Sequence, residues 1–307
     1  MRLIGNQSKR PTRGVLENQN TRKPMDTYQH VTDQIILAME TSGSGWINPM
    51  IQASGGRAFN GVTAARYNGI NVYLLGVLGG GAWASYNQWA SKGCQVREDE
   101  KGAKIVFFKT FKKEVKGKVE TFPVIRNYTV FRFDQVDGDF SEQFSRSETR
   151  VDQTVIIENA EMWVRNTRAQ VNTRDQGRAF YRPSEDSIQM PPRDGFRATE
   201  TSSASEAFYS TLLHELGHWT GHESRLNRLG SKNKHGYAFE ELVAEMAAAF
   251  QCVELGVSAS PRQDHAHYLN GWLKALKGDK RMIVRAAAAA QRAVDYIESL
   301  QNLEEAA

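Results

Sequence analysis

The chain has 307 residues, of which 40% are hydrophobic and 24% are charged. This length is about twice that of a typical domain, and the apolar content excludes a wholly disordered chain, so we expect two folded domains. The two cysteines, Cys94 and Cys252, exclude a disulfide framework and a cysteine-rich zinc site, and they favour a reducing, cytoplasmic location.

Charge is divided unevenly along the chain. Residues 1–140 hold 19 Lys and Arg against 12 Asp and Glu, whereas residues 141–307 hold 20 against 23. We therefore expect the first half to bind a polyanion, although a soluble domain can carry this charge without one. No apolar run reaches the ~18 residues of a membrane span, and the amino terminus lacks the apolar core of a secretory signal. We expect no membrane association.

The predicted elements of the first half begin after a polar, basic segment, residues 1–25, which we interpret as a disordered arm. Apolar residues recur at helical spacing between residues 28 and 40, and a Ser-Gly-Ser-Gly run ends that helix. A second apolar segment follows at 69–77. Two short segments rich in β-branched and aromatic residues, 105–108 and 128–133, then lie on either side of a Lys-Gly-Lys turn at 116–118. This pattern predicts a small antiparallel sheet.

The second half is predicted to be mostly helical. Helical spacing of apolar residues covers 154–167, 203–220, 238–254, 263–276 and 279–301. Residues 177–198 form an irregular or strand-forming segment, and residues 139–153 contain few aliphatic side chains. We therefore predict an α+β fold with a domain at 26–138, a linker at 139–153 and a helical domain at 154–307.

A metal-binding motif lies in the helix predicted at 203–220. Its residues 211–222 read TLLHELGHWTGH, which places His214 and His218 one turn apart on one face, with Glu215 beside them. Two imidazoles in this arrangement can bind one zinc ion, while the glutamate acts as a general base. A capping box at Ser203–Glu206 supports the helix. The alternative is a solvent-facing helix with two ordinary histidines.

Zinc needs a third protein ligand if one position is to stay open for water. The metzincin ligand position falls on Ser224, which is a poor substitute for histidine. His222 lies one further turn along the same helix, and three successive turns project too nearly in a line to surround a tetrahedral ion.

A better third ligand lies in the helix predicted at 238–254. Glu241 and Glu245 stand opposite its apolar stripe, and residues 235–261 contain neither Lys nor Arg. Burying two carboxylates without a cation is costly, and a metal ion with a metal-bound histidine would satisfy both. Following the gluzincin pattern, we assign Glu241 as the third ligand and Glu245 as the carboxylate that orients a histidine, with the reverse left open. The alternative is a solvated acidic edge.

The chemistry expected at this centre is peptide hydrolysis. Zinc held by two histidines and one carboxylate lowers the pKa of its water towards ~7, with manganese as a second choice of metal. Glu215 would take that proton and pass it to the leaving amine. The candidates for stabilising the oxyanion are Tyr181, Arg225, His235 and Tyr237.

Basic and aromatic residues interleave in the first domain, as single-stranded nucleic acid binding requires. The candidate DNA contacts are Arg57, Arg66, Tyr67, Asn71, Trp89, Lys92, Arg97 and Lys104. Aromatic residues in predicted strands are expected in the core instead. They are Phe107, Phe108, Phe131 and Phe133.

These segments together resemble a known family. Residues 27–137 resemble the amino-terminal domain of ArdC-type antirestriction proteins and of the related plasmid TraC primases, through VTDQIILAME, GWINPM, FNGVTAARYNGINVYLL and VFRFDQVDG. The second half resembles the zincin-like domain of the same family, through FYSTLLHELGHWTGHESRLNR, EELVAEMAAAF and the carboxy-terminal WLKALKGDKRMIVRAAAAAQRAVDYI.

The resemblance implies a single-stranded DNA-binding domain at 26–138 joined to a metallopeptidase-like domain at 154–307. It implies a protein of a mobile, plasmid-borne element that protects incoming DNA from host restriction during conjugation, with a host restriction component as a candidate protein substrate. It carries the metal-site roles onto His214, Glu215, His218 and Glu241. Two alternatives stay open: a DNA-binding antirestriction factor with a structural metal, which the intact Glu215 disfavours, and a primase-accessory protein, which the absence of a primase acidic cluster disfavours.

Overall fold

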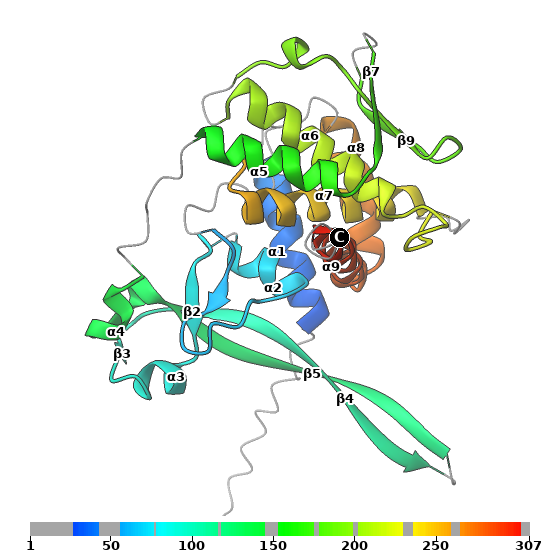
Figure 1. The fold of residues 1–307 in the computed structure, drawn as a ribbon. Helices are drawn as coiled ribbons and strands as arrows, with labels where there is room; N and C mark the ends of the chain where they lie inside the picture. Colours follow the sequence, from blue (N-terminus) through cyan, green and yellow to red (C-terminus); the bar gives the residue numbers. More distant parts are fainter. Residues whose placement is uncertain are drawn as a thin grey trace, which may run out of the picture.

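A computed structural model describes most of the chain. The described ranges are 27–42, 56–76, 78–115, 118–144, 153–174, 178–198, 202–229, 236–258 and 265–301. The predicted arm at 1–25 lies outside them. Small sheets dominate the first half and helices dominate the second, which confirms the α+β fold (Figure 1).

The first half contains one helix of 16 residues, three shorter helices and a four-stranded sheet of order β1-β2-β5-β4 among its described residues. Its helices are α1 (Thr27–Ser42), α2 (Ile70–Gly76), α3 (Tyr86–Ala90) and α4 (Asp139–Glu142). Its strands are β1 (Phe59–Asn60), β2 (Ala82–Ala84), β3 (Gln95–Val96), β4 (Ala103–Val115), β5 (Lys118–Arg132) and β6 (Val136–Asp137). The predicted helix at 28–40 and the antiparallel pairing are confirmed.

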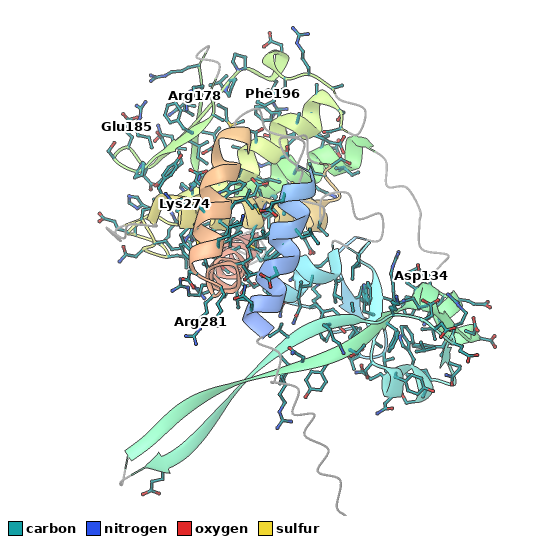
Figure 2. All side chains as sticks on the ribbon, turned by 180° about the vertical axis from the view of Figure 1, so that it is seen from behind. Asp134, Arg178, Glu185, Phe196, Lys274 and Arg281 are labelled. Carbon is teal, nitrogen blue, oxygen red and sulfur yellow. The ribbon has the colours of Figure 1, made fainter. Side chains whose placement is uncertain are left out.

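Strands β4 and β5 are far longer than the sheet that they join. They pair antiparallel from Ala103↔Val130 to Val115↔Lys118, whereas β2 reaches β5 only at its end, through Ala84↔Phe131 and Trp83↔Arg132. The result is a two-stranded β4–β5 ribbon that projects away from the rest of the molecule (Figures 1 and 2).

The described part of the second half is built on five helices of 14 to 20 residues. They are α5 (Gln153–Asn166), α6 (Ala204–Trp219), α7 (Gly236–Leu255), α8 (His265–Gly278) and α9 (Met282–Ser299), each within a few residues of its predicted range. A three-stranded sheet of order β7-β9-β8 packs on α6; its strands are β7 (Gln170–Thr173), β8 (Phe180–Arg182) and β9 (Ser187–Met190). Strand β7 was not among the predicted elements.

The two halves share one of the hydrophobic core clusters among the described residues. Ile35 and Met39 of α1 and Tyr73 of α2 belong to the same buried cluster as Met246 of α7 and Trp272 of α8. In Figure 1, α1 and α2 lie directly against the helices of the second half. Other clusters lie within one half: that of Leu213 and Leu216 in the second, and those of Trp83 and Trp89 in the first. The predicted domain boundaries stay predictions, and the shared cluster shows that apolar faces of the two halves cover each other.

Two further sequence expectations concern cysteines and membranes. Cys94 and Cys252 are both buried and unpaired, in agreement with the prediction that the chain has no disulfide framework. Among the described helices, none combines the length and the apolar character that crossing a bilayer requires.

Candidate metal centre

Helix α6 carries the two histidines, and its start is fixed by a capping box. The Ser203 hydroxyl accepts a hydrogen bond from the Glu206 amide, and the Glu206 carboxylate accepts one from the Ser203 amide at 2.9 Å. The same carboxylate accepts a third hydrogen bond, 2.9 Å, from the amide of Ser258, beyond α7. The capping box therefore also ties α6 to the end of its partner helix.

Helices α6 and α7 cross closely at Gly217. A Cβ atom added there would lie 3.1 Å from Cα and 3.4 Å from Cβ of Ala244. This contact is tight even for small side chains, so the crossing depends on glycine facing alanine. It brings the HExxH face of α6 against the carboxylates of α7.

His214 and His218 meet Glu241 across this contact. The Nε2 atom of His214 lies 3.6 Å from Glu241 Oε2, and the Nε2 atom of His218 lies 3.6 Å from Glu241 Oε1. Ligand atoms from the three residues all fall within 4.8 Å of one another. Ligands about 2.0–2.1 Å from a tetrahedral ion stand about 3.4 Å apart. The donor set and its spacing therefore fit one divalent cation.

The other nitrogen of each imidazole faces a different carboxylate. His214 Nδ1 lies 3.4 Å from Glu245 Oε2, and His218 Nδ1 lies 3.5 Å from Glu240 Oε1. A carboxylate at Nδ1 fixes the ring and leaves Nε2 for a metal ion. The structure thus brings Glu241 to both Nε2 atoms and Glu245 to His214 Nδ1, while their ligand and orienting roles stay predictions. It adds Glu240, which sequence reasoning missed although it sits next to Glu241 in the motif.

Arg228, in the turn after α6, holds Glu240 in place. Its Nε and Nη2 atoms donate to the two Glu240 oxygens at 3.1 and 2.8 Å, and Nη2 also donates to the Gly217 carbonyl at 2.7 Å. Burial raises the pKa of Glu240, whereas its contacts with His218 and Arg228 lower it. The second effect is larger, so the pKa of Glu240 is lowered. Arg228 is therefore the cation that the acidic stretch 235–261 lacks in sequence.

Electrostatics at His218 follow from these carboxylates. Burial alone lowers the pKa of His218, but contacts with Glu240 and Glu241 and the charge of Glu215 outweigh it and raise that pKa to about 10. Glu215 itself is buried, with 2% of its surface exposed. The charge of Glu215 thus contributes to the raised pKa of His218, and its role as general base stays a prediction.

Two of the predicted oxyanion residues form a cluster of their own. The Arg225 guanidinium donates to Asp186 and to the Trp219 carbonyl, and it stacks 3.9 Å from the Trp219 ring centroid. The Tyr181 hydroxyl donates to Asp186 at 2.8 Å. Tyr237 is exposed and His235 lies outside the described residues. The oxyanion role of these residues stays a prediction.

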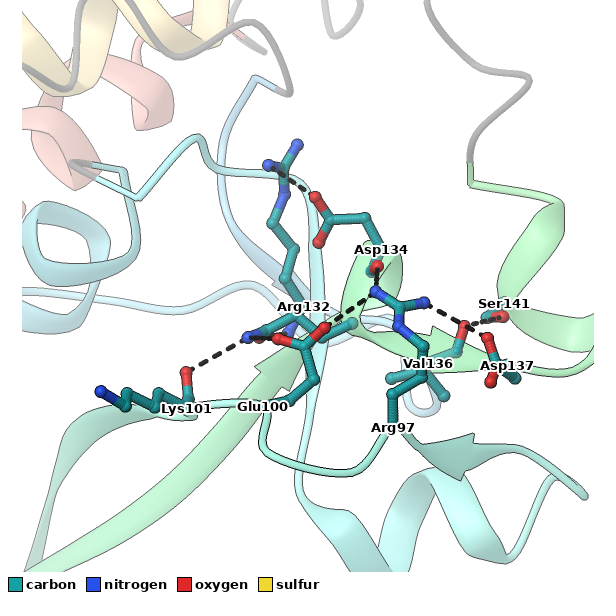
Figure 3. Close-up of polar contacts among 9 residues, drawn as sticks. Arg97, Glu100, Lys101, Arg132, Asp134, Val136, Asp137 and Ser141 are labelled. Carbon is teal, nitrogen blue, oxygen red and sulfur yellow. Dashed lines mark hydrogen bonds and ion pairs between the residues drawn. The ribbon is translucent and has the colours of Figure 1, made fainter.

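All three predicted DNA-binding arginines are paired with carboxylates. Arg57 contacts Glu254 at 3.2 Å and Arg66 contacts the same glutamate at 2.9 Å, which joins the first half to α7. Arg97 contacts Glu100 and Asp137 and donates to the Asp134 carbonyl (Figure 3). These guanidinium groups have structural partners in the free protein.

The remaining DNA candidates differ in exposure. Trp89 is fully buried and its indole N–H donates to the Phe131 carbonyl at 3.0 Å, so its predicted contact with DNA is wrong. Asn71 exchanges two hydrogen bonds, 2.7 and 2.8 Å, with the Val106 backbone and thereby docks α2 on β4.

Lys92 and Lys104 are exposed, and Tyr67 is half-buried with its hydroxyl near the Trp83 carbonyl. Of the aromatic residues expected in the core, Phe131 and Phe133 pack there in part. Phe107 does not, with 50% of its surface exposed, so that expectation was wrong.

Comparisons with known proteins agree with this architecture. Residues 25–131 match the model of the N-terminal domain of anti-restriction factor ArdC, and residues 158–289 match a zincin-like metallopeptidase model. The metal-free crystal structure of the antirestriction protein ArdC from plasmid R388 is 35% identical, with a TM-score of 0.75 over 90% of this chain and 98% of that one. The chain belongs to the ArdC family of antirestriction proteins.

Further comparisons give similar results. An Mn(II)-bound structure of the R388 ArdC protein is 36% identical with a TM-score of 0.72. The uncharacterized protein y4eC of Sinorhizobium fredii is 33% identical over 91% of this chain and 94% of its own length. The DNA primase TraC of Escherichia coli is 34% identical over 90% of this chain, which spans 27% of that primase.

Proposed function

We propose that this ArdC-family chain acts in the cytoplasm as an antirestriction protein that binds single-stranded DNA and hydrolyses a peptide bond at its metal centre. The observation that carries the peptidase part is the approach of both histidine Nε2 atoms to Glu241 at 3.6 Å, beside the buried Glu215. His214, His218 and Glu241 would hold the ion. We propose zinc from the donor set, and the Mn(II)-bound relative supports manganese as the alternative.

The mechanism follows from the positions of the chain's own groups. A divalent ion in this site would polarise a carbonyl and lower the pKa of a water molecule. Glu215 accepts a proton from the water that adds to the peptide carbonyl, and it delivers that proton to the amine as the C–N bond breaks. Glu245 and Glu240 keep the two imidazoles in the tautomer that presents Nε2.

The test of hydrolysis is Glu215→Gln, which keeps the size of the side chain and removes the base. We expect cleavage of denatured casein to fall by about 10²- to 10⁴-fold, with the metal content unchanged. Glu223→Gln, an exposed glutamate in the turn after α6, is the matched control. If protection of incoming DNA and all proteolysis survive Glu215→Gln, the metal is structural and the peptidase assignment fails.

DNA binding is tested by its dependence on salt. The affinity for an oligothymidylate should fall linearly on a logarithmic scale, with a slope of about −0.7 for each phosphate that is neutralised. An affinity that does not respond to salt would contradict an electrostatic contact with single-stranded DNA.

A further inference from the structure

The positive charge of the first half is concentrated in one segment. Residues 101–132 contain nine Lys and Arg and two Glu, whereas the remainder of residues 1–140 contains ten basic and ten acidic residues. The whole excess of the first half, seven charges, thus belongs to the β4–β5 ribbon and its base. Within the first half, the electrostatic attraction for a polyanion is therefore strongest at this segment.

The ribbon is also the part of the molecule that stands clear of the body (Figures 1 and 2). Beyond its base, β4 and β5 pair with each other over the length of β4, and among the described strands none pairs with them there. A two-stranded ribbon is marginally stable in water by itself. The four-stranded sheet uses only the base of the ribbon. We interpret the remaining length of β4 and β5 as a surface for a partner.

Two aromatic rings are exposed on this ribbon. Phe107 and Tyr128 are 50% and 45% exposed, and their rings meet edge to face with centroids 6.0 Å apart. Arg126 is exposed, pairs with Phe107 in register and lies two residues from Tyr128, so the three share one face. Flat rings beside a guanidinium provide stacking surfaces for bases and a partner for phosphates.

Lysines continue the same charge at the base of the ribbon. The base borders a cavity of about 450 Å³ lined by Lys101 and Lys104 together with Leu78 and Trp83. Lys104 is exposed and its ammonium group contacts only the neutral Thr129 hydroxyl among the described side chains. Arg57, Arg66 and Arg97 would have to break an ion pair with a carboxylate before they could bind a phosphate. The described contacts of Lys104 include no such ion pair.

Protection of an edge strand is the structural alternative for a lysine-rich ribbon. Lysines on exposed edges prevent strands of other molecules from pairing with them. That role accounts for the lysines, but it does not account for Phe107 and Tyr128, because exposed aromatic rings on an edge ribbon favour aggregation.

We propose that the β4–β5 ribbon is the single-stranded DNA contact of this chain. Bases stack on Phe107 and Tyr128, and Arg126 on the same face pairs with phosphates. Lys104, on the other face of β4, adds positive charge at the base of the ribbon. This inference rests on the proposed DNA-binding function and moves the contact away from the candidates between Arg57 and Arg97. It favours single strands, since the bases of a duplex are stacked on each other and do not offer their faces to the rings.

The experiment measures binding of a fluorescent oligothymidylate to the full chain by anisotropy. Phe107→Ala and Tyr128→Ala should each weaken binding by about 5- to 150-fold, and Arg126→Gln should reduce the salt slope by about 0.7. Tyr86→Ala, an exposed tyrosine outside the ribbon, and Arg182→Gln, a half-buried arginine of the second half, are the matched controls and should bind as the wild type does.

The outcomes separate this inference from the proposed function. Loss of binding in the ribbon variants alone, with normal circular dichroism, supports the inference. A wild-type chain that binds no oligothymidylate overturns the proposed DNA-binding function itself. A wild type that binds while the ribbon variants bind equally well, or aggregate without any loss of affinity, overturns the ribbon assignment and leaves the lysines with the protective role.

Discussion

Two charged residues outside the HExxH motif, Arg228 and Glu240, support His218. Arg228 binds both oxygens of Glu240, and Glu240 faces Nδ1 of His218. Carboxylates at this position orient the imidazole, and removing such support typically weakens metal binding by about 10- to 100-fold. Arg228→Gln should therefore weaken metal affinity by that factor, as measured by calorimetric titration.

The control for Arg228→Gln is Arg182→Gln, which removes an arginine whose ion pair with Glu185 is exposed. It should leave metal affinity unchanged. Equal affinity in the Arg228 and Arg182 variants would mean that Glu240 does not orient His218.

At the residue scale, spacing along one helix could be read directly from the sequence. It indicated His214, Glu215 and His218, and the polar face of the next helix indicated Glu241 and Glu245. Arg228 and Glu240 could not be found in this way, because their contact depends on the direction in which the turn after α6 returns. Trp89 and Phe107 were assigned to the wrong environments because an aromatic residue in a sequence does not reveal which side of its strand or helix is covered.

At the element scale, the contact between α6 and α7 depends on Gly217. Gly217→Ala places a methyl group 3.1 Å from the Ala244 backbone, so the helices must separate. We expect a loss of about 1–3 kcal/mol in the free energy of unfolding by urea, together with weaker metal binding. Gly195→Ala, where an added Cβ meets no atom within 4 Å, is the control. A fully stable Gly217→Ala protein with unchanged metal affinity would show that this crossing is not what aligns the ligands.

The capping carboxylate of α6 makes stability depend on pH. Burial raises the pKa of Glu206, but hydrogen bonds from Ser203 and Ser258 outweigh it, so the pKa is lowered in the folded protein. A lowered folded pKa means that this stabilisation is complete above the unfolded value of about 4.3 and disappears as the pH falls through the folded value.

Glu206→Gln should therefore lower the free energy of unfolding by about 1 kcal/mol at pH 7, because a charged hydrogen-bond acceptor is lost. In strong acid it should not change the free energy of unfolding. Urea unfolding of both proteins across this pH range measures the difference. A difference that persists unchanged in strong acid would exclude the charge of Glu206 as its source.

The long helices of the second half were predictable because their apolar periodicity is strong. Strand β7 was not, since Gln170–Thr173 is too short to show an alternation. The ribbon was recognised as two short strand segments and a turn, because its lysine-rich centre lacks the apolar pattern that marks a buried strand. Pairing of β4 with β5, rather than burial, extends the strands through that centre.

At the scale of the whole molecule, the shared core predicts cooperative unfolding. Helices α1 and α2 bury apolar side chains against α7, α8 and α9, and Arg57 and Arg66 bind Glu254 across the same boundary. We expect one calorimetric transition for the full chain. Two well-separated transitions would contradict the shared core. This shared cluster could not be predicted from composition, which records where polar segments lie and not which apolar faces meet.

The central claim is that His214, His218 and Glu241 hold one divalent cation. Titration of the metal-free protein with zinc, and separately with manganese, tests it most directly in the wild type, Glu241→Ala and Glu245→Ala. We predict one ion bound by the wild type, a loss of about 100-fold or more in affinity for Glu241→Ala, and a smaller loss of about 10-fold for Glu245→Ala. A wild type that binds neither metal, or a Glu241→Ala protein that binds one ion with wild-type affinity, would contradict the claim.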